Sequence, residues 1–175
     1  MSPESNSRII TLHDLLDHDI QKFTSSEIQL KKSLSEWIAQ TGSLPLKTVL
    51  QRYLDFVQLH VNNLEQACEQ GKITSMNTSN RIMKAFIDDT NERLAECSDP
   101  EVKDACLLAC IQIINHFKIS TYGTAAAFAK ALALDEMATI FHDAELNEKQ
   151  IDQRLSRLAE HEINMRAKAP IVLPG

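Results

Sequence analysis

The sequence has few residues that break helices or close tight turns. Its 175 residues include four glycines and five prolines, and aromatic residues make up 5%. Because glycine and proline are unfavourable inside helices and common in turns, this scarcity favours long helices over short strands joined by turns. The length is enough for one domain with a sizeable core.

The chain also lacks the usual features of nucleic-acid and membrane proteins. Its formal net charge is −6 and no basic patch is visible, which argues against a nucleic-acid partner. No apolar run approaches the roughly 18 to 20 residues that cross a bilayer. The N-terminus, MSPESNSRIITLHDLL, lacks the basic start and apolar core of a signal peptide. We therefore expect no nucleic-acid partner, no membrane association and a cytoplasmic location.

The cysteines show neither CxxC nor zinc-ribbon spacing, and a reducing setting fits them best. Cys106 and Cys110 are four residues apart and would share a helix face. A redox or metal-binding pair is one interpretation. We favour the other interpretation, that Cys106 and Cys110 are simply two small buried residues.

Apolar residues recur at steps of three and four, which is the pattern of amphipathic helices. The first helix carries such a stripe from Leu12 to Trp37 and stops at TGSLP, where Gly42 can take a left-handed turn and Ser43 can start the second helix. That helix ends near Gly71. A weaker helical pattern follows in SNRIMKAFIDDTNERLAEC.

The second half of the chain predicts two more long helices. Asp99 and Pro100 form a helix start, and the helix is expected to run through Gly123 to about Ala133. The last helix begins near Asp135 and carries another apolar stripe.

The pattern predicts an all-α fold. Helices of about 25 to 35 residues are about 40 to 50 Å long and must pack together to bury their stripes. Two antiparallel pairs make a four-helix bundle, with a long crossover at 71–98 that contains a short extra helix. We expect a flexible N-terminus at 1–9, a bundle domain at 10–167, and an extended tail at 168–175, where prolines prevent a helix.

Three polar residues lie on the apolar stripes of different helices. Glu27, His60 and Glu148 would point into the bundle, and carboxylate and imidazole are ligands that hold iron or manganese in bundle cores. The alternative is a solvated edge residue for each glutamate and a hydrogen-bonded core residue for His60. On the remaining long helix the inward residues are Asn115 and Lys118, which are poor ligands. An intact metal centre is therefore not expected.

The stretch HFKISTYGTAAAFAKALALDEMATIFHDAELNEKQIDQRLSRLAE resembles the YciE/YciF-like family of ferritin-like proteins. Its members typically read H-Y-E-I-A-S-Y-G-T and then L-x-E-E-K-x-x-D-x-x-L. The segments HVNNLEQ and SSEIQLKKSL also resemble family motifs, and the likeness covers about residues 10 to 167.

The resemblance implies a ferritin-like bundle, often a homodimer, in bacterial proteins associated with stress responses. It also implies a di-metal carboxylate centre, with Glu27, His60 and Glu148 at ligand positions and Asp152 at the position of a family aspartate. The family's third-helix glutamates fall on Asn115 and Lys118 here, and a polar family position falls on Phe56. The centre is therefore predicted to be degenerate.

We hypothesise that Lys118 replaces the metal charge by pairing with Glu27 or Glu148; the alternative is that its ammonium extends to solvent. The leading prediction is a stress-associated, non-catalytic protein without a metal cofactor, acting by binding or assembly. A second is a metalloprotein in which Glu27, His60 and Glu148 form an iron or manganese site with fewer ligands than the family's di-metal centre, and whose function is related to peroxide. A third is an adaptor that docks a protein partner through the tail APIVLPG.

Overall fold

Helices account for almost all of the described chain. The structure is a computed structural model that describes residues 8–73 and 79–168. The helices are α1 (Leu12–Gln40), α2 (Leu44–Gly71), α3 (Arg81–Glu96), α4 (Pro100–Ala131) and α5 (Asp135–Leu158), followed by the π-helical turn η1 (Ala159–Ile163) and α6 (Asn164–Lys168). The all-α expectation is confirmed.

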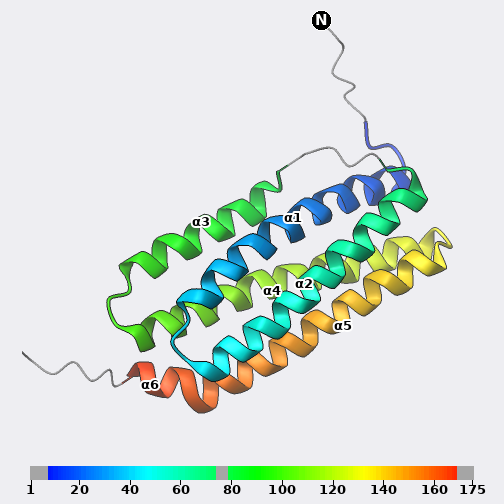
Figure 1. Ribbon diagram of the computed structural model, residues 1–175. Coiled ribbons are helices and arrows are strands. Elements are labelled where there is room, and N and C mark those ends of the chain that lie inside the picture. Colours follow the sequence, from blue (N-terminus) through cyan, green and yellow to red (C-terminus); the bar gives the residue numbers. More distant parts are fainter. Residues whose placement is uncertain (1–7, 74–78, 169–175) are drawn as a thin grey trace, which may run out of the picture.

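The long helices α1, α2, α4 and α5 lie side by side and form the bundle (Figure 1). α1 packs on α2 and α4 packs on α5, while the contacts of α2 with α5 and of α1 with α4 close the bundle. The chain crosses from α2 to α4 through a long connection that contains α3, and α3 lies outside against α1 and α4. This is the ferritin-like arrangement that the sequence predicts.

Side-chain caps explain where the helices begin. Thr11 and Asp14 form a capping box at the start of α1, and the Ser43 side chain accepts a hydrogen bond from the Leu46 N–H at the start of α2. Asn80 and Asp99 each accept two backbone N–H bonds at the starts of α3 and α4. Each cap satisfies backbone donors that have no partner within the helix.

The loop between α1 and α2 differs from the sequence-based expectation. Within residues 8–73 and 79–168 no glycine has a positive φ, so the left-handed turn predicted at Gly42 is wrong. Instead, the N–H groups of Gly42 and Ser43 donate to the Asp104 carboxylate of α4 at 3.1 and 2.7 Å. The loop is held by this contact. The described residues with a positive φ are Lys72 (53°), which follows Gly71, and Ala133 (56°).

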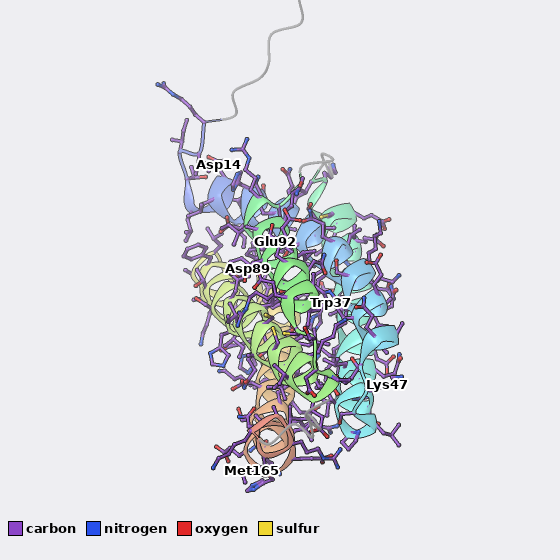
Figure 2. The ribbon with its side chains drawn as sticks, turned by 90° about the vertical axis from the view of Figure 1, so that its left-hand side faces the viewer. Asp14, Trp37, Lys47, Asp89, Glu92 and Met165 are labelled. Carbon is purple, nitrogen blue, oxygen red and sulfur yellow. The ribbon has the colours of Figure 1, made fainter. Side chains whose placement is uncertain are left out.

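The buried apolar side chains form two clusters. The larger lies toward the α1–α2 loop and includes Trp37, Leu50 and Ile151; the smaller lies toward the other end and includes Leu16, Leu64 and Phe141. Figure 2 shows Asp14 and Met165 at opposite ends of the bundle and Trp37 beside α3. There the Trp37 indole N–H donates to Asn91 of α3 at 2.8 Å.

No helix within the described residues 8–73 and 79–168 is long and apolar enough to cross a membrane.

Replacing Asp104 with alanine is expected to reduce the free energy of unfolding by about 2 kcal/mol. The change leaves the N–H groups of Gly42 and Ser43 without their acceptor in a largely buried place. Urea denaturation followed by circular dichroism measures the loss, and Glu96→Ala, at an exposed position, is the control. A loss no larger than that of the control would contradict the role given to Asp104.

Candidate functional site

A group of buried polar side chains lies between the two apolar clusters. Each of the four long helices contributes to it, and its members have exposed fractions of at most 2%. They are Glu27 from α1, Tyr53 and His60 from α2, Asn115, Lys118 and Tyr122 from α4, and Glu148 from α5. We call this group the core polar cluster.

Helical spacing places these side chains. Asn115, Lys118 and Tyr122 follow each other at steps of three and four, so α4 presents all three on one face. Tyr53 and His60 are seven residues apart, or about two turns, on the inner face of α2. The packing of α1 and α5 against these helices adds Glu27 and Glu148.

The three predicted ligand residues converge. One ligand atom from each of Glu27, His60 and Glu148 lies within 4.8 Å of the other two, and all three side chains are buried. By this geometry the three residues could hold a metal ion. The alternative that the glutamates are solvated edge residues is wrong, since their exposed fractions are 2% and 0%.

Lys118 occupies the centre of this arrangement. Its Nζ lies 3.0 Å from Glu27 Oε1 and 2.5 Å from Glu148 Oε1, and the side chain is 3% exposed. The predicted pairing is confirmed with both carboxylates, and the solvent-directed alternative is wrong. Burial by itself would lower the pKa of Lys118, but the charges of Glu148 and Glu27 outweigh it and raise that pKa. Lys118 is therefore an ammonium.

Both oxygens of Glu148 are hydrogen-bonded. Oε1 accepts from Lys118, and Oε2 accepts from the Tyr53 hydroxyl at 2.8 Å and from Asn115 Nδ2 at 2.7 Å. Asn115 Nδ2 also donates to the backbone carbonyl of Glu148 at 3.0 Å. A fully buried carboxylate is stable only with such partners, and here α2 and α4 supply them all.

Glu27 is bound through one oxygen. Its Oε1 accepts from the Tyr122 hydroxyl and pairs with Lys118, while Oε2 has no hydrogen-bond partner within residues 8–73 and 79–168. Burial disfavours the charged form, but the Lys118 charge outweighs it, with help from His60 and Tyr122, and lowers the pKa of Glu27 to about 2. Glu27 is therefore a carboxylate at neutral pH.

The two tyrosines act as hydrogen-bond donors. Burial, followed by the nearby charges of Glu148 and Glu27, raises the pKa of Tyr53 well above its ordinary value. Burial and the Glu27 charge do the same for Tyr122. Both side chains are therefore neutral phenols, whose hydroxyl protons point to the carboxylates.

His60 faces the same two carboxylates without bonding to them. Its Nδ1 lies 3.6 Å from Glu27 Oε1 and 3.5 Å from Glu148 Oε1, and has no hydrogen-bond partner among the described residues. Phe56 stacks on the imidazole with ring centroids 6.4 Å apart. Phe56 therefore places an apolar ring against His60.

These residues do not fit a di-metal centre. Such a centre needs about four carboxylates to balance two divalent cations, and here α4 contributes an amide and an ammonium in their place. The Lys118 ammonium lies against the same two oxygens that would bind a metal, and its charge would repel one. A single ion would have to displace Lys118 before Glu27, His60 and Glu148 could bind it.

The other polar residues considered from the sequence lie outside the core polar cluster. Asp152 bonds to His116 Nε2 at 2.9 Å and to Gln112 Nε2 at 3.3 Å on the outer side of α4 and α5. The side chain of His116 is 64% exposed, and that of His142 is 58% exposed and pairs with Glu145. None of these side chains points into the bundle.

Sequence reasoning did not assign Tyr53 and Tyr122 to the site. A signal was present, because Tyr53 lies three residues after Leu50 and four before Val57 on the inner stripe of α2. Tyr122 lies four residues after Lys118. On a helical stripe a tyrosine is indistinguishable from an ordinary core aromatic residue until the facing carboxylate is known.

Comparison with known proteins gives a consistent result. The family model described as "Domain of unknown function (DUF892)" matches residues 11–168. Protein YciF of Escherichia coli (strain K12) is 26% identical over 159 residues, covering 90% of this chain and 96% of that protein.

Two solved structures share the fold. The crystal structure of the E. coli stress protein YciF matches with a TM-score of 0.83 and 26% identity, covering 89% of this chain and 99% of that one. YcfI from Rhodopseudomonas palustris matches with a TM-score of 0.82 and 26% identity, covering 86% and 96%.

Lys118→Met is expected to reduce the free energy of unfolding by about 3 to 5 kcal/mol, because it leaves two buried carboxylates without their counter-charge. Urea denaturation measures the loss, with Lys149→Met as the control at an exposed lysine. Adding Glu148→Gln to Lys118→Met should cost less than the sum of the two single changes, which shows that the residues are coupled. Additive losses would contradict the pairing.

Proposed function

The chain belongs to the DUF892 family, and we propose that it is a stress-associated ferritin-like protein that acts by binding or assembly rather than by catalysis. The observation that carries this proposal is the contact of Lys118 Nζ with both Glu27 and Glu148 in the centre of the bundle. The stress association rests on the similarity to YciF, a stress protein of E. coli.

The core polar cluster supports a structural role because Lys118 already supplies the positive charge that its carboxylates need. In a working metal centre the ligands must give electron pairs to the ion, and Glu27 and Glu148 instead hold an ammonium. The tyrosines and Asn115 donate further hydrogen bonds to the same carboxylates. We therefore expect the fold to be stable without a metal and the activity to depend on the surface of the protein.

A second candidate function is a metalloprotein with one iron or manganese ion. The convergence of Glu27, His60 and Glu148 favours it. So does the Nδ1 of His60, which has no hydrogen-bond partner in the described part of the chain and could coordinate an ion. In this form Lys118 would have to rotate away, and Glu27, His60 and Glu148 would hold an ion that could supply redox chemistry toward peroxide. The two functions differ in whether the ammonium or the ion holds the carboxylates.

Metal content separates the two functions. We expect the purified protein to bind less than about 0.1 iron or manganese per chain after anaerobic incubation with Fe(II) or Mn(II), as measured by elemental analysis, because Lys118 blocks the ligand oxygens. Lys118→Glu removes the ammonium and adds a ligand, and it should raise metal binding at least tenfold.

In the Lys118→Glu protein, a further Glu27→Gln change should remove the gained metal, which shows that the ion occupies the core polar cluster. About one ion per chain in the unmodified protein, lost on Glu27→Gln, would contradict the leading proposal and support the metalloprotein. About two ions per chain would contradict both.

Binding or assembly is proposed to involve a homodimer in a reducing cytoplasm. The chain exposes large apolar side chains on the bundle, among them Leu44, Leu59 and Leu146, with exposed fractions of 73%, 44% and 48%. The adaptor hypothesis falls on the tail APIVLPG, whose residues 169–175 lie outside the described part of the chain, so it stays a prediction.

Light scattering coupled to size-exclusion chromatography is expected to give the mass of a dimer at micromolar concentration. Deleting residues 169–175 should leave the protein dimeric, because the bundle and not the tail is proposed to form the interface. A monomeric full-length chain would contradict the assembly proposal, and a dimer lost only on deletion would assign the contact to the tail.

A further inference from the structure

Cys97, Cys106 and Cys110 lie together where α3 ends and α4 begins. Cys97 follows the last residue of α3, Cys106 is in the second turn of α4, and Cys110 is one turn further. The side chains of Cys97 and Cys106 lie close enough to interact, and Cys106 lies next to Cys110 in the same way. All three are free thiols, and none of them belongs to the core polar cluster.

The local backbone favours one pair over the other. Residues four apart on a helix have Cβ atoms about 5 to 6 Å apart, whereas a disulfide needs about 3.5 to 4.5 Å. Cys106 and Cys110 are held at the wider spacing by α4. Cys97 is the extended C-cap residue of α3 (φ −78°, ψ 110°), so it can move toward Cys106 without breaking a helix.

Exposure favours the same pair. Cys97 and Cys106 are partly exposed, so a small oxidant can reach them, whereas Cys110 is 2% exposed. Cys68, the remaining cysteine, is buried on α2 within 3.9 Å of the Thr24 hydroxyl. Only Cys97 and Cys106 therefore combine contact, access and freedom to move.

We propose that Cys97 and Cys106 are a redox pair that a hydroperoxide converts to a disulfide linking α3 to α4. One thiol attacks the peroxide, the O–O bond breaks, and a sulfenic acid and an alcohol (water, from hydrogen peroxide) form. The second thiol then displaces the sulfenic oxygen as water and the S–S bond forms. Overall, two thiols lose two protons and two electrons, and the peroxide accepts both.

The link would act on the least anchored helix of the bundle. In α3 the fully buried residues are Met83, Thr90 and Leu94, fewer than in any of the four long helices. Its C-terminal end is joined to α4 by only Cys97, Ser98 and Asp99. A disulfide at this junction restricts the motion of α3 away from α4, and so ties the crossover to the bundle when peroxide is present.

We expect the thiols to react slowly at neutral pH. Burial raises the pKa of both Cys97 and Cys106, which keeps them as thiols, although Arg93 next to both and Lys103 next to Cys97 oppose this effect. Because the thiolate is the reactive form, the rate of disulfide formation should rise with pH. This slow reaction distinguishes the pair from a catalytic peroxidase cysteine.

The test treats the full-length protein with hydrogen peroxide and measures its mass and its peptide map. The expected result is a loss of about 2 Da per chain and a cross-linked peptide pair that contains Cys97 and Cys106, both reversed by dithiothreitol. Thermal unfolding of the oxidised protein should begin at a temperature about 5 °C higher than that of the reduced protein.

Matched cysteine variants make the result specific. Cys97→Ser and Cys106→Ser should each abolish the 2 Da loss, whereas Cys68→Ser and Cys110→Ser should retain it. A Cys106–Cys110 cross-link, a disulfide between chains, or sulfinic acid without any cross-link would each overturn the proposal. Metal content plays no part in these measurements, so they stand apart from the tests of the core polar cluster.

Discussion

The structure depends on the ammonium of Lys118 lying between two buried carboxylates. Glu27 comes from α1, Glu148 from α5 and Lys118 from α4, so three of the four long helices meet at this contact. Removing such charges from water is costly unless each has a counter-charge and hydrogen bonds. Tyr53, Tyr122 and Asn115 provide those bonds, and the bundle can therefore bury charge at its centre.

The same contact constrains how the helices align. The apolar clusters on either side of the core polar cluster could tolerate small shifts, since hydrophobic contacts are not directional. A shift of α4 by one turn would move Lys118 about 5.4 Å and leave both carboxylates buried without a counter-charge. We infer that the core polar cluster specifies the alignment of the helices, as polar residues in other helical cores do.

A bundle of this kind can keep its fold while its central chemistry changes. Two bridging metal ions and one lysine answer the same electrostatic need, which is a positive charge for inward carboxylates. With Asn115 and Lys118 on α4, the need is met by the chain itself. Under the proposals made above, function lies away from the centre, at the exposed surface and at the cysteine pair where α3 joins α4.

The sequence by itself determined the local features of this protein. The helix stripes, the caps at Ser43 and Asp99, and the inward direction of Glu27, His60 and Glu148 all follow from the spacing of residues along one helix. Helical periodicity is an intrachain property, so one chain segment is enough to reveal it.

Only the tertiary structure decided which side chains meet. It placed Lys118 against both carboxylates rather than in solvent, and gave the hydroxyls of Tyr53 and Tyr122 their partners. It also showed that Asp104, rather than a left-handed Gly42, holds the α1–α2 loop. The hydrogen bonds of Asp104 and of the two tyrosines join residues that are 61 to 95 positions apart in the sequence. Such contacts depend on how the helices pack against each other, and the pattern of residues along one helix does not contain that information.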